Sequence, residues 1–428
     1  MKILLLTRTA LKKETSTGNT TGYLFSWAKK EELFNAYFRT ETPNMSICSS
    51  FYCVPESELI KYLFKKRKVG FSFTPTSIPD KKVDESKETT MYARFKKRRL
   101  FLSLWAREVL WRVTTKKWKK SLLDYIESIQ PDCIYMPIYD CFYMHKILSM
   151  VHKKCNSRIV LYSGDDFYSY NFYRCSPFYY LNQFILRKHI SRSCRMANSV
   201  LCFSETEATL FKKAFGKKVI QINKGFPLSR EACFKYNLPN NKRYFELTYV
   251  GNVTYGRIDT LLAIGEAIKN NEILANLFHL TIYSQNELNE KHIKAISKNK
   301  CITFGGGISR EEVDSVIEKS DVLLNVESFK KRDIARVKSS FSTKIVDYLF
   351  SSRCILSVGP REVNSIGYLV DRGVCLHVRS LSDIPSVLLS IVNNADILEE
   401  TALKAFRLGK KEFDSTKCSS IIKKSIIG

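Results

Sequence analysis

The chain has 428 residues, of which 44% are hydrophobic and 12% aromatic, which is the composition of a globular protein and enough length for two domains. Its 69 Lys and Arg outnumber its 42 Asp and Glu, giving a net charge of +27 that predicts a negatively charged partner. The 13 cysteines form no C-x-x-C pair and there are 6 His, so zinc-ligand spacing is absent and the scattered thiols indicate a reducing compartment.

The first residues, "MKILLLTRTA", predict a β-strand, because their apolar run is too short for the core of a signal peptide. Further short apolar runs alternate with longer amphipathic segments. In chain order, the runs that predict strands are 3–6, 133–136, 159–162, 200–203, 219–222, 247–250, 280–283, 301–304, 322–326, 354–358 and 374–378. Apolar strands that alternate with helices are typical of parallel α/β sheets. No run approaches the roughly 20 apolar residues of a membrane span.

Glycines, prolines and neighbouring asparagines interrupt this rhythm at residues 226–243, which therefore predict an interdomain linker. We expect an N-terminal domain over residues 1–225, a C-terminal domain over residues 244–405 and a C-terminal segment over residues 406–428. Both domains are expected to be Rossmann-like and doubly wound, and to face a central cleft, because such folds bind ligands at the carboxyl ends of their strands.

Two turns in the C-terminal half favour a ligand site. In "LTYVGNVTYGRID", Gly251 ends a strand and lets backbone approach a ligand, and Arg257 opens a helix whose N-terminus favours an anion. Gly306 lies in a run of three glycines between another strand and helix. Ordinary turns with a surface arginine would give the same patterns.

The stretch "SSFSTKIVDYLF", residues 339–350, places Lys344 and Asp347 three apart on one helical face. Ser342 and Thr343 add hydroxyls and backbone N–H groups at the same helix start. Phosphate is bound by N–H groups and Lys, whereas a ribose diol is bound by a carboxylate. The alternative is a solvated ion pair of little energetic value.

Taken in order, these segments resemble the C-terminal domain of GT-B glycosyltransferases, most closely the retaining family 4 type found in bacterial surface-polysaccharide synthesis. Gly251 keeps its place in the first motif, Asn252 replaces its Arg, and Arg257 takes the place of its Lys. Asp347 falls on the second of two spaced Glu residues, and Ser339 falls on the first.

Other positions carry the resemblance less closely. Lys344 matches the lysine of a common variant of the later motif, and Glu327 is near enough in sequence to replace the missing Glu in part. In the N-terminal half, Gly18 and Gly22 match a glycine-bearing loop after the first strand. Residues 406–428 correspond to a segment that packs back on the N-terminal domain in the family.

The resemblance implies transfer of a sugar from a nucleotide-diphosphate sugar, UDP- or GDP-linked, to a hydroxyl, with retention and with no cofactor or metal required. Its donor-binding set is Gly251, Asn252, Arg257, Gly306, Glu327, Ser342, Thr343, Lys344 and Asp347. Arg257 and Lys344 would stabilise the leaving diphosphate, and Asp347 would hold the ribose.

Asp165 and Asp166 stand where many members of the family have a His after a strand. They would orient or deprotonate the acceptor hydroxyl, as general bases do. The alternative is that they are loop carboxylates that cap a helix or pair with a nearby Arg.

The positive charge is concentrated in "RFKKRRLFLSLWAREVLWRVTTKKWKK", residues 94–120, which hold eleven Lys and Arg and one acidic residue. A basic helix with Trp and Leu is typical of an interfacial membrane helix. The membrane-contacting residues would be Lys96, Lys97, Arg98, Arg99, Trp105 and Trp111. The alternative is a core helix with a solvated basic face.

The sequence thus predicts a glycosyltransferase that is cytoplasmic and peripheral at the inner face of the cytoplasmic membrane. Its partners would be a nucleotide sugar, a lipid-linked or oligosaccharide acceptor and an anionic membrane surface. No nucleic-acid signature is present, although aromatic and basic residues interleave as single-strand binders require. A nucleotide-sugar-binding protein without catalysis, a nucleic-acid-binding protein and an epimerase of the same fold remain as alternatives.

Overall fold

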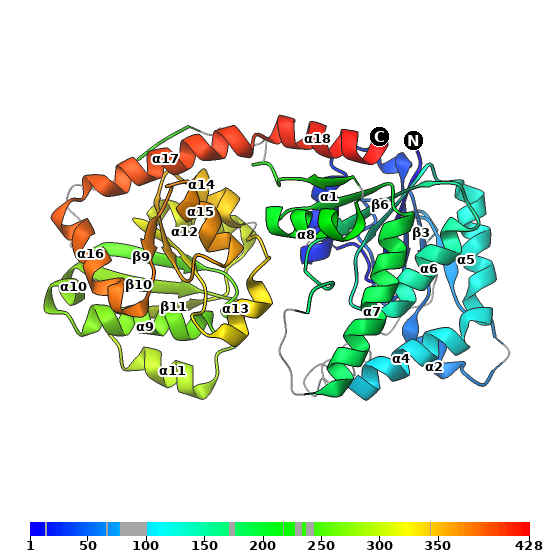
Figure 1. The fold of residues 1–428 in the computed structure, drawn as a ribbon, viewed down its shortest axis with the longest axis horizontal. Helices are drawn as coiled ribbons and strands as arrows, with labels where there is room; N and C mark the ends of the chain where they lie inside the picture. The colour runs from blue at the N-terminus through cyan, green and yellow to red at the C-terminus, as the bar shows by residue number, and fades with distance from the viewer. Residues whose placement is uncertain are drawn as a thin grey trace. The chain divides into compact units, whose positions relative to one another are not determined.

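The computed structural model describes residues 1–12, 15–65, 67–77, 101–170, 176–216, 218–226, 233–236, 244–342 and 344–428. The chain divides into two units (Figure 1). The N-terminal unit comprises Met1–Tyr170, Arg174–Ile222 and Ser419–Gly428, and the C-terminal unit comprises mainly Asn223–Cys418. Most of the expected linker lies outside the described residues. Phe226, at its start, donates its N–H to the Phe413 carbonyl within the C-terminal unit, at 2.9 Å.

The described part of the N-terminal unit contains one eight-stranded sheet in the order β4-β3-β2-β1-β5-β6-β7-β8. Its strands are β1 (Ile3–Thr7), β2 (Leu33–Tyr37), β3 (Ser50–Cys53), β4 (Phe71–Phe73), β5 (Cys133–Pro137), β6 (Arg158–Ser163), β7 (Ser199–Cys202) and β8 (Val219–Gln221). All of these pairs are parallel except β3 with β4. Its helices are α1 (Ser16–Leu24), α2 (Glu56–Lys61), α4 (Phe101–Val113), α5 (Thr115–Ile129), α6 (Phe142–His152), α7 (Pro177–Met196) and α8 (Glu205–Phe215).

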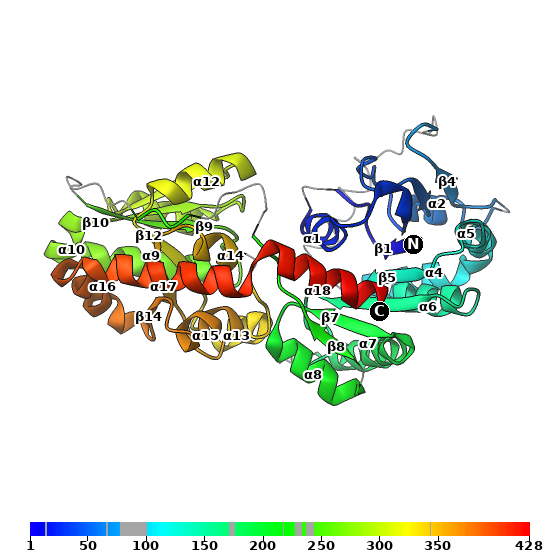
Figure 2. The ribbon, with the colours of Figure 1, turned by 90° about the horizontal axis from the view of Figure 1, so that it is seen from above.

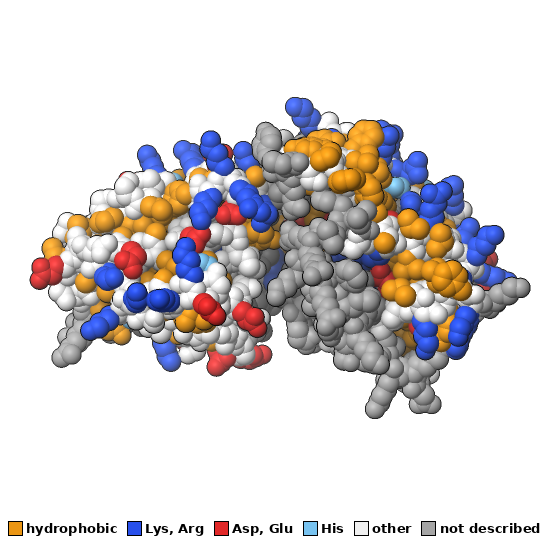
Figure 3. All heavy atoms as spheres, turned by 90° about the horizontal axis from the view of Figure 1, so that it is seen from below, with side chains coloured by type: hydrophobic (Ala, Val, Ile, Leu, Met, Phe, Trp, Pro, Cys, Tyr) orange, Lys and Arg blue, Asp and Glu red, His pale blue; other side chains and the backbone are white. Residues whose placement is uncertain are grey.

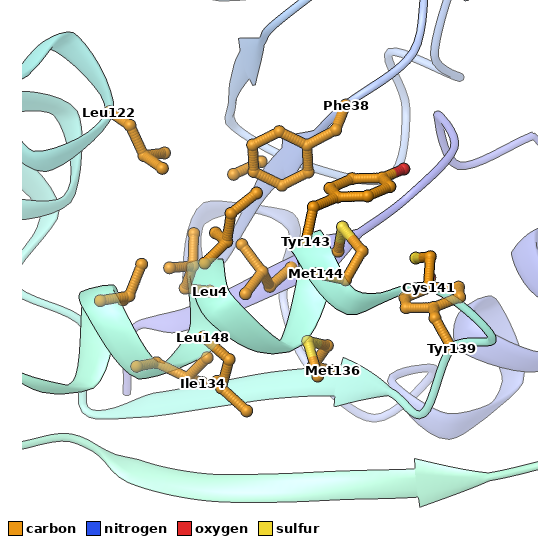
Figure 4. Close-up of a cluster of buried hydrophobic side chains, with 14 of the residues drawn as sticks. Leu4, Phe38, Leu122, Ile134, Met136, Tyr139, Cys141, Tyr143, Met144 and Leu148 are labelled. Atoms are coloured by element: carbon orange, nitrogen blue, oxygen red, sulfur yellow. The ribbon is translucent and has the colours of Figure 1, made fainter. Parts of the chain in front are cut away.

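Two hydrophobic cores lie on opposite faces of this sheet, because successive side chains of a strand point to opposite faces. On β1, Leu4 and Leu6 belong to one core, which helices α4 to α8 cover. Ile3 and Leu5 belong to the other core, which also contains Leu24 of α1. Figure 4 shows part of the first core, with Leu4 of β1, Ile134 of β5 and Leu148 of α6 among its side chains.

The last helix, α18 (Ser415–Ile427), ends in the N-terminal unit (Figure 2). Ile422 and Ile426 are buried in the core formed with Ile3 and Leu5. The Ser425 carbonyl accepts a hydrogen bond from the Ser199 hydroxyl at 3.3 Å. The final residues of the chain therefore complete the fold of the first unit.

The described part of the C-terminal unit holds a parallel six-stranded sheet in the order β11-β10-β9-β12-β13-β14. Its strands are β9 (Phe245–Val250), β10 (Phe278–Tyr283), β11 (Ile302–Gly306), β12 (Val322–Val326), β13 (Cys354–Val358) and β14 (Leu376–Val378). Its helices are α9 (Arg257–Lys269), α10 (Glu272–Leu277), α11 (Glu290–Ser297), α12 (Arg310–Lys319), α13 (Lys331–Val337), α14 (Lys344–Leu349), α15 (Asn364–Asp371), α16 (Ile384–Asn393) and α17 (Asp396–Glu412). The side chains of β12 also alternate between two hydrophobic cores: Val322 and Leu324 belong to one core, and Leu323 belongs to the other.

Each strand expected from the sequence is present, with ends that differ by at most two residues. Strands β2, β3 and β4 were not expected. In β2 the apolar run is broken by Asn35, which is fully buried because its side-chain amide donates to the Leu5 carbonyl at 2.8 Å and to the Thr7 hydroxyl at 2.9 Å. Strands β3 and β4 are four and three residues long.

Candidate active site

A pocket of about 190 Å³ lies at the carboxyl ends of β9 and β12 in the C-terminal unit. It is lined by Tyr249, Asn252, Arg257, Leu324, Asn325, Val326, Glu327, Ser340, Phe341, Ser342, Lys344, Ile345, Tyr348 and Ser365. Parallel strands bring their carboxyl ends, and the helices that follow them, to one edge of the sheet, which is where ligands bind in such folds.

Lys344 reaches this pocket through a space that Gly251 leaves open. The Lys344 ammonium donates to the carbonyl of Val250 at 2.8 Å and lies 5.1 Å from the centroid of the Tyr249 ring. A Cβ atom at position 251 would lie 1.6 Å from Lys344 Nζ. Gly251 also has a φ of +148°, which a residue with a side chain rarely adopts. A side chain at position 251 would therefore force the Lys344 ammonium to move from its observed place.

Arg257 and Glu327 form a bidentate ion pair in the same pocket. Arg257 Nε and Nη2 donate to the two carboxylate oxygens of Glu327 at 2.9 and 2.8 Å. Glu327 is 4% exposed, and Ser365 donates to the same carboxylate at 3.4 Å. The planar fork of Arg matches a carboxylate in this geometry, which fixes the guanidinium beside Lys344.

Burial and charge together set the protonation of these groups. Burial and the nearby Arg257 guanidinium lower the pKa of Lys344 to about 8, although Glu327 opposes the shift. Burial also disfavours the charged form of Arg257, but the Glu327 carboxylate outweighs it and raises the pKa of Arg257. The pocket thus carries two cations and one anion near neutral pH, with Lys344 as a group that titrates just above it.

Of the remaining residues that were expected to bind a donor, some line this pocket and others do not. Asn252 and Ser342 line the pocket. Gly306 lies at the end of β11, where its carbonyl accepts from Ser284 N–H at 2.8 Å, and Asp347 lies on α14; neither is among the described lining residues. Thr343 lies outside the described residues.

Ser340, whose hydroxyl the sequence placed at the same helix start as Ser342, lines the pocket, whereas the sequence did not single out Tyr249, Asn325, Tyr348 and Ser365 as site residues. Tyr249 donates its hydroxyl to the Asn252 carbonyl at 2.6 Å and so holds the turn after β9. Tyr348 follows Lys344 by four residues and therefore shares its helical face, where Asp347 had been expected. A polar or aromatic residue at the end of a buried strand is the signal that would have found Tyr249 and Asn325.

In the N-terminal unit, Asp165 and Asp166 lie in the loop after β6. Asp166 accepts from the N–H groups of Tyr168 and Ser169 at 3.1 and 2.8 Å, which closes a turn. Burial and the charge of Asp140 raise the pKa of Asp165.

Glu207 on α8, which the sequence did not single out, lies close to this loop. Its carboxyl is 2.5 Å from the Ser163 hydroxyl, and burial, together with the charges of Asp166 and Asp165, raises its pKa to about 7. Within the described residues, no group of three or more His, Cys, Asp or Glu could hold a metal ion.

Gly18 and Gly22 were expected in a loop, but both lie in helix α1. The helix begins here because Thr15 caps it, its hydroxyl accepting from the Gly18 N–H at 3.1 Å. A Cβ on Gly18 would lie 1.9 Å from the Lys12 carbonyl oxygen, whereas one on Gly22 would meet nothing within 4 Å. Gly18 therefore allows a close backbone approach, and the loop prediction is wrong for both.

The expected membrane helix is only partly exposed, and Lys96, Lys97, Arg98 and Arg99 lie outside the described residues. Trp111 is 1% exposed and stacks on Tyr143 with ring centroids 4.6 Å apart. Its assignment as a membrane contact is therefore wrong, since its indole is part of the core. Trp105 packs edge-on against Phe178 of α7, at 6.0 Å. None of the helices that the structure describes is long and apolar enough to span a bilayer.

Comparison with known proteins shows similarity in structure but not in sequence. No family model and no curated protein matches the chain. A structure of Anabaena Alr3699/HepE in complex with UDP matches with a TM-score of 0.64 at 12% identity, over 100% of both chains. HepE in complex with UDP-glucose matches with a TM-score of 0.60 at 13% identity, over 100% of this chain and 99% of that one.

A sucrose-phosphate synthase from Thermosynechococcus elongatus matches with a TM-score of 0.63 at 9% identity, over 99% of this chain and 98% of that one. At these identities the likeness shows the fold. The two parallel α/β sheets of this chain thus form a GT-B-like fold, similar to that of known glycosyltransferase structures.

Proposed function

We propose that this chain is a retaining glycosyltransferase that moves a sugar from a UDP-sugar to a hydroxyl of a lipid-linked glycan acceptor in cell-surface polysaccharide synthesis. The observation that carries the proposal is the placement of Lys344 beside the Arg257–Glu327 pair in one pocket of a GT-B-like unit. The similar HepE structures hold UDP and UDP-glucose, which favours uracil over guanine as the base.

The pocket has the chemistry to bind a diphosphate. The Lys344 ammonium has three N–H donors, and the described hydrogen bonds use one of them, toward Val250. Arg257 keeps its positive charge while Glu327 holds it in place. These two cations can neutralise phosphate oxygens in a site that is partly shielded from water, where such interactions are strongest.

The proposed reaction exchanges one glycosidic bond for another. The bond between the anomeric carbon and the β-phosphate oxygen breaks, and the acceptor oxygen bonds to the same carbon. Charge develops on the departing diphosphate, and Arg257 and Lys344 stabilise it. The proton of the acceptor hydroxyl passes to a carboxylate, for which Asp165 and Asp166 are the candidates.

The other donor contacts belong to the same proposal. Asp347 would hold the ribose diol, and Gly306 and Thr343 would present backbone N–H groups to the donor. The basic residues 96–99 and Trp105 would hold the protein at the cytoplasmic face of the membrane, near a lipid-linked acceptor.

Binding of nucleotides to Lys344→Ala tests the donor site. Isothermal titration with UDP, GDP, ADP and CMP should show binding of UDP to the wild-type chain and a loss of at least tenfold in the variant, because a charge-assisted hydrogen bond to phosphate is worth about 1.5–3 kcal/mol. Lys338→Ala is the matched control, since Lys338 pairs with Glu362 at 3.5 Å on the surface of the same unit. Unchanged affinity in Lys344→Ala would refute the site.

A nucleotide-sugar-binding protein without catalysis is the second candidate, because Ser339 stands where the family pattern has its first Glu. Turnover separates the two. A transferase releases UDP from a UDP-sugar when an acceptor hydroxyl is present, whereas a binding protein raises its melting temperature with the same ligand and releases none.

A further inference from the structure

Helix α7 exposes one face along its whole length, and this face is apolar near the start of the helix and basic near its end. Near its start, Phe178, Leu181 and Phe184 are 53%, 48% and 50% exposed. Further along, Lys188 and Arg192 are exposed on the same side, since residues three and four apart share a helical face. The helix of 20 residues contains no Asp or Glu.

A second pocket, of about 530 Å³, lies along the basic half of this face. It is lined by Tyr168, Phe184, Arg187, Lys188, Ser191, Arg192, Arg195 and Met196. The Arg187 guanidinium lies 4.0 Å from the Tyr168 ring centroid and 4.6 Å from that of Tyr170, and it also donates to the Tyr168 carbonyl. One cation is therefore fixed in the wall of the pocket.

Four cations line this pocket or its edge. In the part of the chain that the structure describes, no carboxylate lies within ion-pair distance of Arg187, Lys188, Arg192 or Arg195. Burial, together with the charges of Lys146 and Arg192, lowers the pKa of His189 to about 4. The positive charge near Arg192 therefore disfavours protonation of His189 as well.

We infer that this face of α7 binds the surface of an anionic membrane, taking a lipid phosphate into the basic pocket and laying its exposed apolar side chains against the acyl chains. A soluble phosphate would account for the cations but not for the adjoining Phe178, Leu181 and Phe184. An apolar protein partner would account for those three but not for four cations with no acidic partner among the described residues. An amphiphile matches both halves of the face.

Helix α4 extends the apolar half of this surface. Trp105 of α4 packs on Phe178 and donates its indole N–H to Asn182 of α7 at 3.0 Å. Val109, four residues after Trp105 and therefore on the same face of α4, is 57% exposed. Figure 3 shows hydrophobic patches on the surface of the N-terminal unit with lysine and arginine side chains around them. This surface deepens the membrane part of the proposed function and is independent of the donor pocket.

Vesicle flotation of the full chain tests the inference. Vesicles of phosphatidylcholine mixed with phosphatidylglycerol should bind the wild-type protein more tightly than phosphatidylcholine alone. Arg192→Gln with Arg195→Gln should weaken binding about 30-fold, since each positive charge near an anionic leaflet contributes about fivefold. Leu181→Gln with Phe184→Gln should also weaken it, because the acyl-chain contacts are lost.

Helix α11 of the other unit supplies matched controls. Lys291→Gln with Lys294→Gln removes the same charge from an exposed helix, and Ile293→Gln removes an apolar side chain that is 55% exposed. Both controls should bind vesicles as the wild type does. If the α7 and α11 charge variants lose the same amount of vesicle affinity, the net charge of the protein explains the binding and the inference is overturned.

Two further experiments test whether the pocket binds a soluble phosphate or a nucleic acid instead of a lipid. If inorganic phosphate displaces the protein from vesicles at constant ionic strength and the apolar variants bind normally, the pocket is a soluble-phosphate site and the inference fails. It also fails if the charge variants lose affinity for a single-stranded oligonucleotide but not for vesicles. UDP titration of every variant reports separately on the donor pocket, so a failure of the proposed function is recognised independently.

Discussion

The Lys344 ammonium occupies the place that a side chain on Gly251 would take: a Cβ atom on the glycine would lie 1.6 Å from the Nζ atom of the lysine. The ammonium remains there because it donates to the Val250 carbonyl at 2.8 Å. This contact therefore joins two turns that are far apart in the sequence, one after β9 and one before α14.

Gly251→Ala should lower UDP affinity about 10- to 100-fold, because the methyl group displaces Lys344 from the pocket and a charge-assisted hydrogen bond of about 1.5–3 kcal/mol is lost. The double variant with Lys344→Ala should bind no more weakly than Lys344→Ala alone, since both changes remove the same interaction. Titration calorimetry measures both quantities.

Gly373→Ala is the control for backbone strain in this experiment. Gly373 also has a positive φ, of +64°, but a Cβ there would meet nothing within 4 Å. The Gly373→Ala variant should therefore be somewhat less stable than the wild type but should bind UDP with the same affinity. Additive losses in the double variant at 251 and 344 would show that the glycine acts in some other way.

The affinity for UDP should fall as pH rises through about 8. The pKa of Lys344 in the free protein is lowered to about 8, so above this pH the ammonium must regain a proton before it can pair with phosphate. Below this pH the proton is already bound and the affinity should be flat. Above it the dissociation constant should rise about tenfold per pH unit.

Calorimetry in buffers of different ionisation enthalpy checks this directly, because binding near pH 8.5 should take up a proton. The Lys344→Ala variant should show neither the slope nor the uptake. A wild-type affinity that stays constant between pH 7 and 9.5 would contradict the role of Lys344.

Glu327→Gln should destabilise the protein by about 3–5 kcal/mol, because removing one partner of a buried ion pair leaves the other charge uncompensated. Chemical denaturation measures the loss. UDP should restore part of it, since the diphosphate supplies the negative charge that Arg257 has lost.

The exposed pair Arg361–Asp371 is the control for Glu327→Gln. Its atoms are 2.6 Å apart, but the side chains are 67% and 52% exposed. Asp371→Asn should therefore cost at most about 1 kcal/mol. Equal costs at the two pairs would mean that burial of Glu327 contributes nothing.

The fold was predictable because strands that are buried on both faces appear in the sequence as short apolar runs between helical segments, as at β5, β9 and β12. Strand β2 was missed because Asn35 interrupts its apolar run, and the two hydrogen bonds that the Asn35 amide donates, to Leu5 and Thr7, exist only after the sheet has formed. A single sequence does not encode such a pairing locally.

The donor pocket was predictable in part for a similar reason. Arg257 follows the turn after β9, and topology brings such turns to one edge of the sheet. Lys344 opens α14, which follows helix α13, and it was predicted from its place at a helix start. The bidentate contact of Arg257 with Glu327, and the exclusion of Asp347 from the described lining in favour of Tyr348, depend on how the helices are rotated against the sheet. Spacing alone does not fix that rotation.

Trp111→Ala should destabilise the N-terminal unit by about 3–5 kcal/mol and leave vesicle binding of the folded protein unchanged, because the side chain fills the core between Phe38, Trp118 and Tyr143. Trp111→Phe should cost far less, since the described structure shows no partner for the indole N–H and the ring still packs. Denaturant titration and vesicle flotation, read together, distinguish a core residue from a membrane contact. Loss of vesicle binding in Trp111→Phe at full stability would restore the membrane assignment that burial argues against.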